Sequence, residues 1–310
     1  MNHFFKLLIV LFALPNHSLS AQSQANAGKK TQNKTVATPK PKPTSPSHQD
    51  IFNLKMQMPR PLSMAQGVVA MGSTFIGNPY PKANADTSRR TVTGQVVLQP
   101  IQKEVLVVNL KKFDCVTFVE SMIALTQTQR DSFKSFDLFK KKLTQVRYRN
   151  AQIDYAARLH YFSDWLYENE QHGILTNITK DIGGERFHKI VNYMSTKRDT
   201  FYGNMADPTT FNTMKEIEKN ITLREKWYIP KEKVAAIESK LKEGDIIGIT
   251  NITEGMDMAH AGIVIFVSGR AHLLHASSQF QQVVISDVPL VDYLKRNKLQ
   301  TGIMVGRLKE

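Results

Sequence analysis

The spacing of hydrophobic residues changes about three quarters of the way along the chain. Helical patterns predominate first, and they predict helices over 63–76, 151–169 and 230–242. After Gly244-Asp245 the apolar residues form short β-branched runs, separated by turns that contain Gly, Ser or Asn. Helices first and closely spaced strands last predict an α+β domain with an antiparallel sheet.

The strands of this sheet can be placed from the runs themselves. We expect successive strands over Ile246–Thr250, Ala261–Val267, Leu273–Ala276 and Val283–Ser286, with Ile303–Leu308 as a fifth. Residues 105–110 form an earlier strand candidate, and Gly77-Asn78-Pro79-Tyr80 is a turn that ends the first helix.

The amino-terminal region is typical of an export signal followed by a tether. Lys6 precedes an apolar run, Leu7–Leu14, that is too short to span a bilayer, and small residues follow it. We therefore predict a signal peptide over 1–21, with a membrane anchor or a disordered start as the alternative. Residues 22–55 are rich in Lys, Pro, Ser, Thr and Gln and predict a flexible linker.

Composition favours a folded, exported protein with a basic surface. The chain has 310 residues, is 41% hydrophobic and carries a formal net charge of +14. Residues 51–310 hold 35 basic and 26 acidic residues, a net of +9. This charge favours polyanionic partners, although a generally basic surface explains it equally well. No Lys/Arg stripe with interleaved aromatics indicates nucleic-acid binding, and no other segment resembles a membrane span.

The lone cysteine, Cys115, is the first candidate for chemistry. It cannot form an internal disulfide, so it is either a buried small hydrophobe or a functional thiol. Asp114 is a good helix N-cap, and apolar residues follow Cys115 at helical spacing. A thiol in the first turn of a helix feels the positive end of the macrodipole, which favours a nucleophilic thiolate.

A nucleophilic thiol needs a base, and the histidines in the predicted sheet are candidates. His272 and His275 are three residues apart in a strand, so they point to opposite faces and do not form a zinc pair. If the loop at Ser268-Gly269 has two residues, His260 lies opposite Ser277, with His275 one diagonal step away on the same face. His260 and His275 then converge, and His272 is a structural residue.

Several motifs resemble those of a known superfamily of bacterial cell-wall peptidases. Asp114-Cys115-Val116-Thr117-Phe118 resembles the cysteine motif of the NlpC-type papain-like peptidases. Gly244-Asp245-Ile246-Ile247, His260-Ala261-Gly262-Ile263 and Leu274-His275-Ala276-Ser277 resemble its sheet motifs in the expected order. The chain is similar, more narrowly, to the N-acetylmuramoyl-L-alanine-amidase-like branch, through Ile76–Tyr80, Arg158–Trp165, Tyr228-Ile229-Pro230 and Gly255-Met256-Asp257.

The resemblance implies a papain-like core over 56–310, in which a cysteine-bearing helix packs on a barrel-like antiparallel sheet, with a helical insert at about 130–240. Cys115 is then the nucleophile, His260 the general base and acid, and His275 the orienting residue, with Ser277 as the alternative in that last role. No metal or cofactor is implied. The mature protein is expected to be a periplasmic or secreted monomer that acts on peptidoglycan or muropeptides.

The implied reaction is hydrolysis of the N-acetylmuramoyl-L-alanine bond. The alternatives are an endopeptidase that cuts between D-γ-glutamyl and the diamino acid, a transacylase, and a non-catalytic wall-binding protein on the same fold. Asp114, Tyr80 and Asp257 lie in motifs expected to border the cleft. A further stretch can bind sugar or a peptide carboxylate, or is simply a solvated helix face; it holds Arg147, Tyr148, Arg149, Arg158, His160 and Tyr161.

Overall fold

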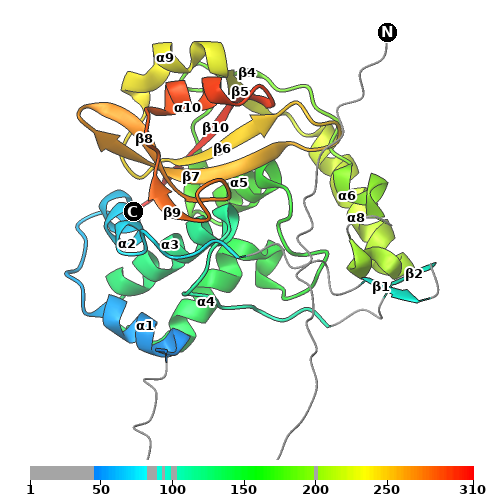
Figure 1. Cartoon of the computed structure of the whole chain (residues 1–310), viewed down its shortest axis with the longest axis horizontal. Coiled ribbons are helices and arrows are strands. Elements are labelled where there is room, and N and C mark those ends of the chain that lie inside the picture. Colours follow the sequence, from blue (N-terminus) through cyan, green and yellow to red (C-terminus); the bar gives the residue numbers. More distant parts are fainter. Residues whose placement is uncertain (1–44, 82–88, 93–94, 99–102, 199–201) are drawn as a thin grey trace, which may run out of the picture. The chain divides into compact units, whose positions relative to one another are not determined.

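The computed structural model describes residues 45–81, 89–92, 95–98, 103–198 and 202–310 (Figure 1). The predicted signal peptide and residues 22–44 of the predicted linker lie outside these ranges. The folded part begins earlier than expected, because helix α1 (His48–Met56) occupies the last residues assigned to the linker. Ser47 and Asp50 form a capping box that satisfies the free N–H groups at the start of this helix.

Four longer helices form most of the layer on one face of the sheet. They are α2 (Met64–Ser73), α3 (Cys115–Arg130), α4 (Phe136–Arg147) and α5 (Phe162–Gln171). Helix α3 packs against α2 and α4 and against strands β7 and β8. A glycine permits this closeness, since a Cβ on Gly72 would lie 2.9 Å from Leu274 Cδ2 and 3.1 Å from Phe118 Cζ.

The described part of the chain forms an antiparallel sheet in the carboxy-terminal half, so the α+β class is confirmed. Hydrogen-bonded neighbours follow the order β4-β5-β10-β6-β7-β8-β9, and β3 also pairs with β10. The strands are β3 (Leu175–Asn177), β4 (Glu185–Arg186), β5 (Trp227–Pro230), β6 (Ile246–Asn251), β7 (Met258–Val267), β8 (Arg270–Ser277), β9 (Gln282–Ile285) and β10 (Gln300–Leu308). The order is an open path with different strands at its two ends, so these pairings do not close a barrel.

Both faces of the central strands are buried. Along β7, Ile263 belongs to the core that includes residues of α2 and α3, whereas Val264 belongs to a core with residues of α9 (Val234–Ile237) and α10 (Leu290–Arg296). Figure 1 places α9 and α10 on the side of the sheet opposite α2 and α3. This burial explains why the strands are continuous apolar runs and do not alternate with polar residues.

The remaining elements are short except α8, which is as long as α3. They comprise the hairpin β1 (Arg89–Val92) and β2 (Gln95–Leu98), the α-helices α6 (Tyr193–Thr196) and α8 (Pro208–Leu223), and the 3-10 turns η1 (Arg149–Ala151), η2 (Gly203–Ala206), η3 (Lys231–Lys233) and η4 (Glu238–Lys240). The predicted insert at 130–240 therefore contains β3, β4 and β5 as well as helices.

Three sequence predictions of local structure were wrong in whole or in part. Residues 105–110 are irregular, and the carbonyl of Val107 bonds the Arg147 side chain, with no strand beside it. The helix expected over 151–169 begins only at Phe162, because residues 152–161 form a turn that folds back to bridge Tyr148 with Arg158. The helix expected over 230–242 is broken into η3, α9 and η4, and Pro230 pairs with Gly302 at the end of β5.

Within the described ranges, no helix has both the length and the apolar character that crossing a bilayer requires.

Candidate active site

Cys115 is the first residue of α3, and Asp114 caps this helix. The Asp114 Oδ1 atom accepts hydrogen bonds from the backbone N–H groups of Val116 (3.0 Å) and Thr117 (2.8 Å). The Asp114 N–H donates to Thr117 Oγ1 at 3.1 Å and completes a capping box. The cap fixes the start of the helix, and so it fixes the backbone that carries the thiol.

The hairpin of β7 and β8 carries the two predicted histidines. Its turn has two residues, Ser268 and Gly269, and both have positive φ (50° and 79°), as expected for a tight hairpin. The structure brings His260 and His275 together as the predicted register requires. Their Nε2 and Nδ1 atoms lie 2.6 Å apart, and their ring planes are nearly perpendicular at 87°.

Room for the His275 ring comes from a glycine on the neighbouring strand. A Cβ on Gly262 would lie 3.0 Å from the His275 Cβ and 2.6 Å from the Leu273 Cγ. His275 is completely buried, and its Nε2 atom has no hydrogen-bond partner among the described residues. A side chain at position 262 would therefore displace a ring that has no free space around it.

Two other polar residues of β8, His272 and Ser277, are engaged elsewhere. His272 lies on the opposite face, and its Nδ1 atom is 2.8 Å from the backbone carbonyl oxygen of Ser286. The Ser277 hydroxyl accepts a hydrogen bond from the Phe280 N–H at 3.2 Å, within the turn that follows β8. The geometry thus pairs His260 with His275.

The Cys115 thiol lies against the strand that carries His260. The backbone N–H of Ala261, the next residue in β7, is close enough to the thiol to oppose part of the rise in its pKa. Tyr293, on α10, packs its ring against both histidines, with ring centroids 6.5 Å from His260 and 5.5 Å from His275. Tyr293 could not be predicted from the sequence, because it lies in a short helix with no motif around it.

Burial keeps the central groups neutral. Desolvation, together with the nearby Asp114 carboxylate, raises the pKa of the Cys115 thiol to about 12. Desolvation lowers the pKa of His260 to about 4, and desolvation plus the neighbouring His260 lowers the pKa of His275 to about 3. Near pH 7 the free site therefore holds a thiol and two neutral imidazoles.

A cleft of about 600 Å³ opens beside Cys115. Predicted site residues that line it are Tyr80, Asp114, Cys115, Tyr148 and Arg158. Further lining residues include Asn109, Lys112, Thr117, Glu120, Arg147 and His160. The cleft therefore joins the start of α3 to residues around 147–160, which the sequence marked as a candidate substrate-binding stretch.

Charged side chains in one wall of the cleft are paired with each other. Arg147 Nε bonds Glu120 Oε2 at 2.6 Å, and both side chains are almost completely buried. Arg158 Nε and the Tyr148 hydroxyl both donate to Glu104 Oε1, at 2.9 and 2.6 Å. Glu104 and Glu120 were missed from the sequence, because no motif marks an acid whose partner is far along the chain.

Asp257 does not line the cleft. It is buried, and its Oδ2 atom accepts a hydrogen bond at 2.7 Å from the Ser163 N–H in the first turn of α5. Its other oxygen accepts from the Met258 N–H. Arg149 and Tyr161 are also turned away from the cleft, since Arg149 pairs with Asp164 and the Tyr161 hydroxyl with Glu218.

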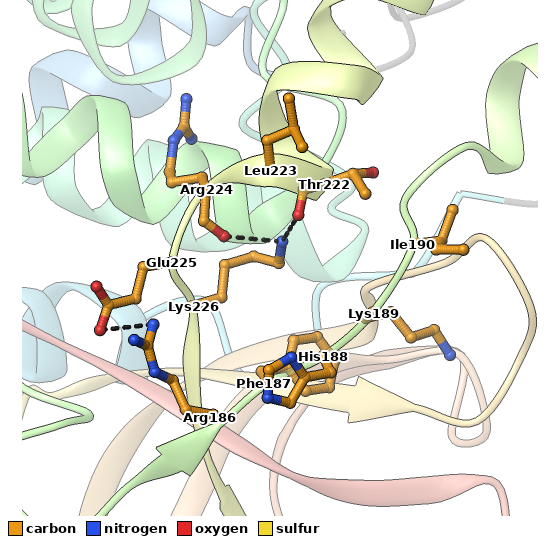
Figure 2. A pocket seen from close by; sticks show the side chains of 10 residues that line it. All are labelled: Arg186, Phe187, His188, Lys189, Ile190, Thr222, Leu223, Arg224, Glu225 and Lys226. Carbon is orange, nitrogen blue, oxygen red and sulfur yellow. Dashed lines mark hydrogen bonds and ion pairs between the residues drawn. The ribbon is translucent and has the colours of Figure 1, made fainter.

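The described residues contain no group of three or more His, Cys, Asp or Glu side chains placed to hold a metal ion. Another hollow, of about 400 Å³, is lined by residues 186–190 and 222–226 (Figure 2). It shares no lining residue with the Cys115 cleft. Its cations are engaged locally, as Figure 2 illustrates for Lys226 with two backbone carbonyl groups and for Arg186 with Glu225.

Residues 70–303 match the AmiA-like family, whose description is N-acetylmuramoyl-L-alanine amidase-like. The chain belongs to this family. Cys115, His260 and His275 all lie inside the region that matches the AmiA-like family, whereas helix α1 lies before it.

The solved structures that are similar to this chain include an amidase. A structure of an N-acetylmuramoyl-L-alanine amidase from Bacteroides uniformis is 33% identical, with a TM-score of 0.70 over 80% of this chain and 99% of that chain. A putative xylanase from Bacteroides fragilis is 32% identical, with a TM-score of 0.66 over 76% of this chain and 99% of that one. A protein from Legionella pneumophila is 20% identical, with a TM-score of 0.56 over 85% of this chain and 93% of that one, and shares the fold. A comparison with curated proteins gives no match.

Proposed function

We propose that this chain is a cysteine-dependent N-acetylmuramoyl-L-alanine amidase with an NlpC-type papain-like core. The observation that carries the proposal is the hydrogen-bonded pair of His260 and His275 on two strands that pack against α3, whose first residue, Cys115, lines the cleft. A nucleophile, a base and a group that orients the base are the parts of a Cys-His hydrolase. The bond assignment rests on the AmiA-like family and on the Bacteroides uniformis amidase.

The hydrogen bond between the two histidines suggests how the base is prepared. His260 uses Nε2 toward His275, so its Nδ1 atom is the one left to accept the thiol proton. In that tautomer the His260 Nε2–H donates to His275 Nδ1, and His275 carries its own proton on Nε2. His275 is then a positioning residue that holds the His260 ring in the tautomer required for a base.

In the first step, the Cys115 sulfur attacks the lactyl carbonyl carbon of N-acetylmuramic acid while His260 takes the thiol proton. The tetrahedral intermediate carries an oxyanion. The N–H groups of Val116 and Thr117 are already bonded to Asp114, so the backbone N–H of Cys115 is the available donor in this turn. Tyr80 borders the same cleft, and burial raises the pKa of its phenol, so it stays protonated and able to donate.

Collapse of the intermediate breaks the C–N bond. His260 gives its proton to the departing amino group of L-alanine, and the muramoyl group remains on Cys115 as a thioester. Water then attacks the thioester with His260 as base, and the products are free N-acetylmuramic acid and a regenerated thiol. Because the thiol and imidazole are neutral at rest, proton transfer accompanies sulfur attack.

We infer that the protein works outside the cytoplasm, as a monomer, on peptidoglycan or muropeptides and without a cofactor. The predicted signal peptide and the wall polymer that the family acts on both support this location. The domain division into signal, linker and hydrolase stays a prediction.

The deciding experiment is mass spectrometry of defined muropeptides after incubation with the mature protein and with Cys115→Ala. We expect release of the intact stem peptide from the sugar by the wild type alone. Cleavage inside the stem would overturn the bond assignment and favour the endopeptidase. Absence of cleavage across intact wall and soluble fragments would leave a wall-binding protein.

A further inference from the structure

The cleft contains several cationic residues, but most of their charge is already balanced. Arg147 is paired with Glu120, and Arg158 with Glu104. His160 also lines the cleft, and burial with the nearby Arg158 lowers its pKa to about 4, so it is neutral near pH 7. These groups offer little net charge to an incoming anion, because each guanidinium already faces a carboxylate.

Lys112 is different. It lines the cleft, its side chain is exposed, and among the described residues it makes no ion pair or side-chain hydrogen bond. Its backbone is fixed on both sides, since its N–H donates to Asn109 Oδ1 at 3.0 Å and the next residue, Phe113, is completely buried. The ammonium group is therefore available to a ligand and attached to a fixed point of the cleft.

The neighbouring lysine provides an internal comparison. Lys111 has the same charge, and its backbone N–H donates to the same side-chain oxygen, Asn109 Oδ1. Its Nζ atom, however, bonds the Ser45 hydroxyl at 3.3 Å, and Lys111 does not line the cleft. The carboxylate nearest to Lys112 in sequence, Asp114, is committed to the cap of α3. The free charge of Lys112 thus faces the cleft, and that of Lys111 faces elsewhere.

We propose that Lys112 is a specificity-determining residue that binds a substrate carboxylate, so that the enzyme prefers stem peptides with acidic D-glutamate to those in which this carboxylate is amidated. The inference rests on the proposed function. Lys112 is three residues before Cys115, a span of at most about 10 Å between Cα atoms. The D-glutamate α-carboxylate is the first one after the scissile bond, a single residue beyond L-alanine, so a lysine side chain at this distance reaches it.

Binding tests the proposal separately from catalysis. The probes are N-acetylmuramoyl-L-alanyl-D-glutamate and its D-isoglutamine counterpart, which differ only at this carboxylate. Their affinities are measured by calorimetry or NMR titration on Cys115→Ala, which keeps the cleft and prevents turnover, and again after adding Lys112→Gln or Lys111→Gln. We expect the acid to bind about twofold to fivefold more tightly than the amide, because one solvent-accessible charge pair contributes up to about 1 kcal/mol.

Lys112→Gln is expected to reduce this ratio to about one, by weakening binding of the acid and leaving the amide unchanged. Lys111→Gln is expected to keep the ratio. Equal affinities in the parent protein, a ratio that survives Lys112→Gln, or no binding of either probe would each overturn the proposal. Cleavage of the muramoyl bond by the wild type is measured separately. If the wild type does not cleave this bond but the affinity ratio still depends on Lys112, the amidase function is wrong and the carboxylate site stands.

Discussion

The histidine hairpin and the wall of the Cys115 cleft are built from different interactions. In the hairpin, β7 and β8 hold His260 and His275 through a regular ladder, a two-residue turn and close apolar packing, and both rings are neutral. In the cleft, the wall is held by charged contacts between residues 27 and 54 positions apart, Glu120 with Arg147 and Glu104 with Arg158.

The hairpin positions its side chains precisely, whereas each charged side chain of the wall depends on its ion-pair partner. In the hairpin, strand register fixes the positions of the rings, and register is set by nearby sequence. In the wall, each buried charge is tolerated only because its partner is present, since an unpaired buried charge is costly. We therefore expect changes in the hairpin to act mainly on catalysis and changes in the wall to act mainly on stability.

The largest effect is expected for His260→Ala. Without the base, kcat/KM for muropeptide cleavage should fall by about 10³-fold, because general base catalysis contributes up to about 10⁴-fold. The circular dichroism spectrum and melting temperature should change little, since this side chain is not part of the apolar core.

His272→Ala is the matched control, because it removes a histidine from the opposite face of the same hairpin. It should keep kcat/KM within about threefold. Activity of His260→Ala within tenfold of the wild type would contradict the assignment of the base.

The wall is tested by Glu120→Gln, which leaves the buried Arg147 guanidinium without its counter-ion. We expect the free energy of unfolding, measured by urea titration, to fall by about 3 kcal/mol. Asp287→Asn breaks the exposed pair with Arg296 and should cost less than about 1 kcal/mol.

A second variant shows whether the loss of stability in Glu120→Gln arises from the unpaired charge of Arg147. Adding Arg147→Met to Glu120→Gln should restore part of the lost stability, since no charge is then buried alone. A loss below about 1 kcal/mol in Glu120→Gln would show that this wall does not depend on the pair.

A smaller effect is expected for Gly262→Ala. The added methyl group would lie 2.6 Å from Leu273 Cγ and 3.0 Å from His275 Cβ, so the Leu273 side chain must shift and the His275 ring must move by a few tenths of an ångström. We expect kcat to fall by about tenfold with little change in KM, because neither of these residues lines the substrate cleft and the histidines lose their alignment. An unchanged kcat would mean that the pair tolerates displacement.

The smallest effect is expected from mild acid. Neutral His260 is the active form, and burial lowers its pKa to about 4, so protonation begins to remove the base only below about pH 5. From pH 7 to pH 5.5, kcat/KM should change by less than about twofold, with circular dichroism as the control for folding. An acidic limb centred near 6.5 would show that the imidazole is not desolvated in solution.

The same contrast explains how much could be predicted from sequence. The antiparallel sheet, the turn at Ser268-Gly269 and the meeting of His260 with His275 follow from strand spacing and turn chemistry, which are local. The start of α3 follows from its N-cap, Asp114. The turn, the histidine pair and the helix start need only the sequence within about fifteen residues of each position, whereas the pairing of β6 with β10 is long-range.

The wall could not be predicted in the same way. Glu104 directly precedes the strand that was wrongly predicted over 105–110, and its partners are 44 and 54 residues away. Tyr293 reaches the histidines from α10, on the far side of β9 in sequence. No periodic pattern in the sequence marks Glu104 or Tyr293. Their contacts are with residues far away in sequence, which only the folded sheet brings close.

The two-residue turn of the β7–β8 hairpin has a consequence for sequence comparison. Adding or removing one residue in each strand of such a hairpin changes the sequence separation of a cross-strand pair by two. Two side chains that share a face at a separation of 15 residues therefore also share a face at 13 or 17. An even interval puts them on opposite faces unless a bulge intervenes. The parity of the interval between two histidines is therefore a simple criterion for recognising this histidine pair in other sequences.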